Sequence, residues 1–111
     1  MKFERFDIVI VPFPFTDLPV TRRRPALVLS AAAWNAASGH IVCAMITSAG
    51  RSSWPLDVPV TDLASAGLTA PCVVRMKLFT IEAGFVVRRA GALGREDAVA
   101  IHAACKVLLT A

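Results

Sequence analysis

The sequence lacks a long hydrophobic run, and this absence excludes a membrane-spanning helix. Seven prolines interrupt the apolar stretches, so none of them reaches the roughly 18 residues that such a helix needs. The segment Met1–Asp7 carries charges of both signs and has no long apolar core of the kind found in secretory signal peptides. We therefore expect a cytoplasmic protein without a membrane partner.

Cysteine and histidine are scarce, and neither shows the spacing of metal ligands. Each of the three cysteines, Cys43, Cys72 and Cys105, stands in an apolar run, which predicts buried thiols in a reducing compartment. The two histidines, His40 and His102, lie far apart in the chain. The sequence therefore predicts no metal site and no cofactor.

Charged residues are also few, at 18% of the chain against 56% hydrophobic residues. A domain of 111 residues buries a limited fraction of its surface, so we expect a homodimer with an apolar interface. The length suits one domain that spans residues 1–111. The net charge of +4, with nine arginines among the twelve basic residues, fits an anionic partner and equally fits simple solubility.

Short β-branched and aromatic runs separated by turns predict a mainly β fold with short helices. The predicted strands are Phe6–Phe15, Pro25–Ser30, His40–Thr47, Leu56–Val60, Cys72–Ile81 and Phe85–Leu93. The predicted helices are Ala31–Ala37, with Ser30 as its cap and Gly39 as its end, Asp62–Gly67, and Arg95–Leu109. Thr16–Arg24 is predicted to be a loop, and His40–Thr47 is apolar enough to be covered on both faces. We expect a small, strongly twisted sheet or barrel with a closing C-terminal helix.

Three arginines, Arg22, Arg23 and Arg24, stand directly before Pro25 and the apolar run Ala26–Leu29. Proline favours an extended conformation in the residue that precedes it. Arg24 would therefore be held at the entrance of a strand, where its planar guanidinium could bind phosphate.

Two further groups could act with this arginine. The hydroxyls of Thr47 and Ser48 end an apolar strand just before a polar loop that carries Arg51, and Arg75 is the first charged residue of a long strand. Cleavage of RNA by its own 2′-hydroxyl needs a base, an acid and positive charge at phosphorus. Arginine and threonine can supply the charge and hydrogen bonds for this chemistry without a metal.

Each of these features also has a purely structural interpretation. The arginines could form a solvated basic loop, and the hydroxyls could be ordinary strand-end residues. Arg75 could pair across the sheet with Glu82 or Asp57, and Trp34 and Trp54 could simply pack. The residues alone predict a basic, β-rich dimer that is able to bind nucleic acid.

The order and spacing of six sequence blocks resemble those of the MazF/PemK family, the toxin endoribonucleases of type II toxin–antitoxin pairs. The blocks are DIVIVPFPFTD (Asp7–Asp17), RRPALVLS (Arg23–Ser30), ITS (Ile46–Ser48), AGL (Ala66–Leu68), VVRMKLFTI (Val73–Ile81) and GALGRED (Gly91–Asp97). The resemblance implies an SH3-like β-barrel and a homodimer. It also implies a groove across the dimer for single-stranded RNA, and an antitoxin whose C-terminal segment occupies that groove. DNA would be contacted only through the antitoxin.

The same resemblance assigns roles to residues. Arg24 and Thr47 match the family's usual catalytic pair in metal-independent cleavage of mRNA, which inhibits translation and growth. The residues expected to bind RNA are Arg22, Arg23, Ser48, Arg51, Arg75 and Lys77.

Two positions depart from the family pattern. Lys77 stands where some members carry an aspartate two residues after the arginine, which leaves the general base unassigned, and Phe6 replaces a common glycine. Two alternatives therefore stay open. The related CcdB proteins share the barrel and poison a DNA gyrase by contact, which here would involve Val107–Ala111. The chain could also be an inactive relative that only binds RNA or its antitoxin.

Overall fold

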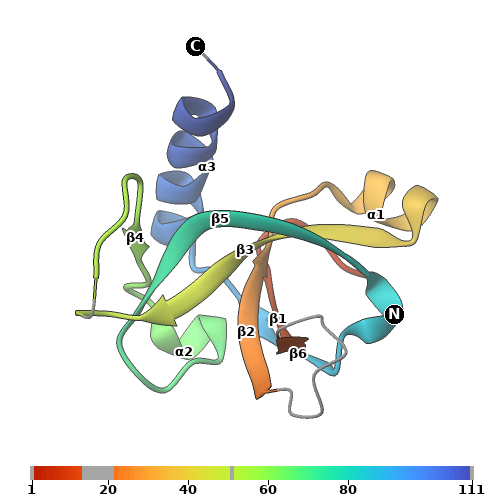
Figure 1. Cartoon of the computed structure of the whole chain (residues 1–111), viewed down its shortest axis with the longest axis horizontal. Coiled ribbons are helices and arrows are strands. Elements are labelled where there is room, and N and C mark those ends of the chain that lie inside the picture. The colour runs from red at the N-terminus through yellow and green to blue at the C-terminus, as the bar shows by residue number, and fades with distance from the viewer. Residues whose placement is uncertain (1, 14–21, 51, 111) are drawn as a thin grey trace.

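A computed structural model describes residues 2–13, 22–50 and 52–110 of the chain. Its main feature is a sheet of six antiparallel strands in the order β4-β5-β3-β2-β1-β6. The strands are β1 (Asp7–Phe13), β2 (Arg22–Val28), β3 (His40–Ser48), β4 (Val58–Pro59), β5 (Cys72–Glu82) and β6 (Arg88–Ala92). The sheet curls into a half-barrel, with β3 and β5 crossing over the other strands as long arcs (Figure 1). This confirms the predicted mainly β, barrel-like fold.

In the residues that the structure describes, three α-helices and one 3-10 helix complete the fold. They are α1 (Ala32–Ser38), α2 (Leu63–Ala66), η1 (Ala83–Phe85) and α3 (Arg95–Leu109). The predicted bounds of α3 are confirmed, and Gly39 ends α1 in the left-handed conformation, as predicted. None of the helices in the described part of the chain has the length and apolarity needed to cross a membrane.

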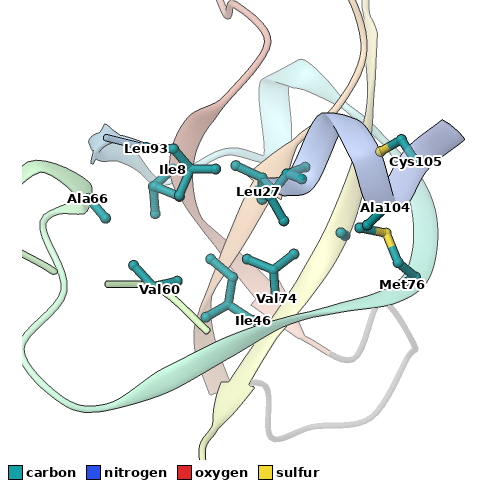
Figure 2. Packing of buried hydrophobic residues seen from close by; sticks show 12 residues of the cluster. Ile8, Leu27, Ile46, Val60, Ala66, Val74, Met76, Leu93, Ala104 and Cys105 are labelled. Carbon is teal, nitrogen blue, oxygen red and sulfur yellow. The ribbon is translucent and has the colours of Figure 1, made fainter. Parts of the chain in front are cut away.

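One apolar cluster fills the space between the sheet and helices α2 and α3 (Figure 2). Its buried members are Ile8, Leu27, Ala44, Ile46, Val60, Ala66, Val74, Met76, Leu93, Ile101, Ala104 and Cys105. Leu108, in the last turn of α3, is 39% exposed. The C-terminal turns of α3 extend beyond the sheet (Figure 1), in agreement with the exposure of residues 106–109.

A second apolar cluster covers the opposite face of the sheet. Its buried members are Phe3, Val9, Val11, Ala26, Val28, Ile41, Cys43 and Ile81. Because side chains alternate between the faces of a strand, Ile41 and Cys43 of β3 join this cluster while Ala44 and Ile46 join the first one. The prediction that β3 is covered on both faces is confirmed.

Helix α3 is fixed to the sheet by a buried carboxylate in its first turn. Both Asp97 oxygens are used: Oδ2 accepts hydrogen bonds from the backbone N–H groups of Thr61 and Asp62, each at 3.0 Å, and Oδ1 accepts from Thr61 Oγ1 at 2.6 Å. An acidic group also interacts favourably with the positive end of the helix dipole. The segment that follows β4 is thereby held against α3.

Strand β2 begins at Arg22, three residues before its predicted start at Pro25. The predicted loop Thr16–Arg24 is therefore wrong for its last three residues, and its residues 16–21 lie outside the described ones. Pro25 is tolerated inside the strand because only β1 is paired with β2 there: the ladder with β3 covers Ala26–Val28. Proline removes a ladder donor and is accepted where a strand lacks a neighbour.

Other element ends also differ from the predicted ones. Strand β4 is shorter than Leu56–Val60. Strand β6 starts only at Arg88, because Phe85 belongs to η1 and the next two residues have no regular structure. Ser30 does not cap α1; its hydroxyl donates to the Asn35 side chain at 2.5 Å instead. Phe6 precedes β1, with a φ of 75°.

Candidate active site

The candidate site lies where β2 and β3 separate. Their ladder ends at Ala26, which faces Met45. If this register continued for two more residues, Arg24 would face Thr47. The strands part instead, and side chains from both line two adjoining hollows of about 170 and 270 Å³, each of which includes Arg24 and Thr47. The structure therefore brings together the two residues predicted to be catalytic.

The two hollows lie on opposite sides of the parted strands. The first is closed by side chains of the second-cluster face, namely Val11, Phe13 and Phe79. The second is bounded by the loop 67–71 after α2. Arg24 and Thr47 line both hollows, so a bound group could reach them from either one.

Arg24 is exposed and Thr47 is half-buried. Within residues 2–13, 22–50 and 52–110, the Arg24 side chain makes no hydrogen bond or ion pair. An exposed guanidinium that lines the same hollows as a threonine hydroxyl has five N–H donors available to an anion. The chemistry available here is binding of an oxyanion and stabilisation of negative charge that develops on it.

Three of the residues predicted to contact RNA border this site. Arg22 and Arg23 are exposed on the free part of β2, and Ser48 lines the larger hollow. Because side chains alternate along a strand, Arg22 lies on the same face as Arg24 and Arg23 on the opposite one. Arg51 lies outside the described residues.

Arg75 is not free in the same way. Its guanidinium donates from Nε to Asp57 Oδ1 at 3.2 Å and from Nη2 to Asp57 Oδ2 at 3.0 Å. It also donates from Nη1 and Nη2 to the side chain and backbone oxygens of Ser52, each at 3.2 Å. Of the two carboxylates that the sequence left open as partners, Asp57 is the one used.

This pairing perturbs both groups in the expected directions. The hydrogen bonds from Arg75 hold the pKa of Asp57 below its ordinary value, and Asp57 raises the pKa of Arg75. Both groups therefore stay charged at neutral pH. Arg75 fastens the segment 52–57 to β5, so a direct contact with RNA would require Arg75 to share these donors.

Lys77 and Trp54 lie next to the ion pair of Arg75 and Asp57. Lys77 is exposed, and its Nζ lies 5.6 Å from the centroid of the Trp54 ring, while the Arg75 guanidinium carbon lies 5.3 Å from the same centroid. The structural interpretation, in which Trp34 and Trp54 pack, holds only in part, because the two side chains are 45% and 43% exposed. Sequence reasoning missed Trp54 because a single tryptophan in a loop has no spacing signal.

The cysteines are mostly inert structural thiols. Cys43 and Cys105 are buried, as predicted, and burial raises the pKa of Cys43 to about 12. Cys72 is only half-buried and lines the larger hollow, but desolvation and the nearby Asp97 raise its pKa as well. Among the described residues, no three His, Cys, Asp or Glu side chains gather closely enough to hold a metal ion.

A family model matches almost the whole chain. Residues 4–109 match the model of the "PemK-like, MazF-like toxin of type II toxin-antitoxin system". No curated protein sequence matches the chain closely enough to count as a relative.

Solved structures share the fold. A MazE–MazF crystal structure from Deinococcus radiodurans superposes with a TM-score of 0.77 at 20% identity, covering 98% of this chain and 97% of the other. The Mycobacterium tuberculosis toxin MazF-mt6 gives a TM-score of 0.72 at 25% identity, covering 91% and 93%. A mycobacterial endoribonuclease in complex with its cognate antitoxin gives 0.74 at 15% identity, covering 97% and 93%.

Proposed function

Because the chain belongs to the PemK-like, MazF-like toxins of type II toxin–antitoxin systems, we propose that it is an endoribonuclease that cleaves single-stranded mRNA without a metal ion and so inhibits translation and growth. The observation that carries the proposal is the meeting of Arg24 and Thr47 in the hollows where β2 and β3 part. A free guanidinium beside a hydroxyl fits a phosphodiester group.

In the proposed reaction the substrate supplies its own nucleophile. The ribose 2′-hydroxyl loses a proton as its oxygen attacks phosphorus, and the bond from phosphorus to the 5′-oxygen breaks. That oxygen then gains a proton. The products are a 2′,3′-cyclic phosphate and a 5′-hydroxyl. Arg24 stabilises the charge of the phosphorane, and Thr47 donates a hydrogen bond to a non-bridging oxygen.

Few side chains in the two hollows are able to transfer a proton. In the described residues neither hollow is lined by a carboxylate or an imidazole, and the two titratable side chains present are Arg24 and Cys72. The thiol of Cys72 is protonated at neutral pH because its pKa is raised. We assign delivery of the leaving-group proton to Arg24, which lines both hollows.

The RNA backbone would be held on both sides of this pair. We assign phosphate contacts to Arg22, Arg23, Ser48, Arg51 and Lys77, because arginine, lysine and hydroxyl side chains are the usual backbone contacts. Arg75 would contribute mainly by holding the segment 52–57 in place.

The proposed partners are an antitoxin and a second copy of the chain. Two of the similar structures were solved together with an antitoxin. A homodimer would cover apolar side chains that α3 leaves exposed, such as Val99 at 66% and Val107 at 65%. Contact with DNA would then be indirect, through the antitoxin, and the site of action would be the cytoplasm, where mRNA is translated.

A second candidate function is compatible with the same fold but involves no catalysis. Two apolar side chains near the C-terminal end of α3 are mostly exposed: Val107 at 65% and Leu109 at 71%. An apolar helix end of this kind would suit a CcdB-like poison that binds a DNA gyrase. The presence of Arg24 and Thr47 favours the ribonuclease.

The test is incubation of purified protein with a long RNA of mixed sequence in the presence of a chelator, beside a gyrase supercoiling assay. The proposal expects discrete RNA fragments with cyclic-phosphate and 5′-hydroxyl ends and unimpaired supercoiling. Intact RNA with blocked supercoiling would establish the gyrase poison. Intact RNA that is nevertheless bound would identify an inactive relative.

A further inference from the structure

The Trp54 side chain is partly exposed and lies beside two positively charged side chains. Its ring is 43% exposed, although two cationic side chains of β5, Arg75 and Lys77, lie within 6 Å of its centroid. A large aromatic side chain that is both held and accessible is a common feature of surfaces that bind single-stranded nucleic acid.

The turn that carries Trp54 is held by a single carboxylate. Asp57 Oδ2 accepts a hydrogen bond from the Trp54 backbone N–H at 2.9 Å, and the Asp57 N–H donates to the Trp54 carbonyl at 3.2 Å. The same carboxylate binds Arg75 through both of its oxygens. Ring, turn and guanidinium therefore form one preorganised unit, which lowers the entropic cost of binding a ligand.

The Arg75 side chain of this unit lies on the same face of the sheet as the Thr47 side chain. Arg75 is the cross-strand partner of Met45, and Met45 is two residues from Thr47 on β3. At roughly 5 Å between strands and roughly 7 Å along two residues, the backbones of Arg75 and Thr47 are close neighbours.

An open depression lies beside Asp57, one strand away from Thr47. A hollow of about 550 Å³ lies between the loop and β5, with Ser52, Asp57 and Val73 in its lining, and Val73 is the cross-strand partner of Thr47. The residues after Val73 include a register shift that leaves two extra residues, Met76 and Lys77, between Arg75 and Leu78. Such a bulge bends the strand and redirects a side chain; Lys77 is exposed and lies beside the tryptophan.

We propose that Trp54 is the stacking platform for one unpaired base of the RNA next to the cleaved phosphate, with Lys77 on the adjoining backbone and Asp57 and Arg75 as positioning residues. The proposal rests on the ribonuclease function and adds a position at which the substrate is read. Base–aromatic stacking tolerates every base but differs in strength between them. Trp54 therefore biases cleavage towards particular bases at one position and does not set a strict sequence.

Binding is measured with a single-stranded 2′-fluoro RNA oligonucleotide of mixed sequence, which lacks the attacking hydroxyl and stays intact. Trp34→Phe serves as the parent protein, because it leaves Trp54 as the only tryptophan. We expect the oligonucleotide to quench the fluorescence of Trp54. Relative to wild type, Trp54→Ala should weaken binding by roughly 5- to 150-fold, whereas Trp54→Phe should retain most of it.

Cleavage of natural RNA gives a second measurement, the base preference beside the cut. Replacing a purely structural tryptophan would not change this preference. Trp54→Ala should still cut but lose its base preference at one position beside the cut, and Trp54→Phe should keep that preference. If wild type cuts RNA while the fluorescence of Trp54 and the base preference of Trp54→Ala are unchanged, the platform is wrong and the ribonuclease stands. If Trp54→Ala turns a dimer into a monomer with the base preference retained, the ring belongs to a subunit interface and the platform is again wrong. If wild type neither binds nor cuts RNA, both proposals fall.

Discussion

Two arginines of the same sheet, Arg24 and Arg75, have different surroundings. In the described part of the chain the Arg24 side chain has no partner, whereas Arg75 uses its guanidinium on Asp57 and Ser52. Both stand near the ends of strands and both belong to sequence blocks of the same family. The difference teaches that an arginine's role is decided by which acceptors the fold places around it: Arg24 is available to a substrate, and Arg75 holds a loop.

Removing Arg24 should have the largest effect on activity and almost none on stability. We expect Arg24→Ala to slow RNA cleavage by about 10²- to 10³-fold or more, as loss of a charge-stabilising group does. Arg24→Lys keeps the charge but loses the planar fork, and should recover only part of the rate. Single-turnover cleavage and thermal denaturation measure the two quantities. A large drop in Tm for Arg24→Ala would show that this arginine is structural after all.

Thr47 should matter less, because a neutral hydroxyl contributes less than a guanidinium. Thr47→Val removes the hydrogen bond and keeps the shape, so cleavage should slow by roughly 10- to 100-fold. Thr47→Ser keeps the hydroxyl and should stay near the wild-type rate. Equal rates for Thr47→Val and Thr47→Ser would remove the hydroxyl from the mechanism.

Substitutions around Arg75 and Asp57 should affect stability more than cleavage, the reverse of what we expect for Arg24. Asp57→Asn weakens the bonds that hold Arg75 and the Trp54 turn, so it should lower Tm more than Arg24→Ala does while slowing cleavage much less. Glu82→Gln is the matched control, because Glu82 is the exposed carboxylate at the other end of β5. A Tm for Asp57→Asn as high as that of Glu82→Gln would mean that the ion pair does not stabilise the fold.

The stability advantage of wild type over Asp57→Asn should depend on pH. The pKa of Asp57 is lowered in the folded protein from its ordinary value of 3.8. The carboxylate therefore adds stability that is fully present above that value and is lost as pH falls through the lowered folded pKa. Urea unfolding between pH 7 and pH 2.5 should show the two proteins converging at the acidic end. A constant difference throughout would exclude titration of Asp57 as its source.

Much of the fold could be predicted from sequence, and the site only partly. The α3 bounds Arg95–Leu109 and the order of the strands follow from periodicity and turn residues, which are local signals. The start of β2 was missed because Pro25 is a local strand breaker, and only the three-dimensional pairing shows that β3 leaves it a free side. Arg24 and Thr47 were assigned through the family resemblance, since their meeting depends on strand register.

The smallest expected effect concerns Phe6, the departure from the family's glycine. Its φ of 75° is strained for a residue with a side chain, while its ring packs on the first cluster and under the Arg5 guanidinium. Phe6→Gly loses the ring but relieves the strain, and Phe6→Ala loses the ring and keeps the strain. Phe6→Ala should therefore be less stable than Phe6→Gly by about 1 kcal/mol in urea unfolding. The opposite order would show that Phe6 is not strained.

The most direct test of the central claim is a double-mutant cycle of cleavage rates with Arg24→Ala, Thr47→Val and the double variant. If both residues act on one phosphate, the double variant should be little slower than Arg24→Ala alone, because Thr47 has less charge to stabilise once the guanidinium no longer positions the group. Rate losses that simply multiply would contradict the account, since they would mean that Arg24 and Thr47 contribute independently.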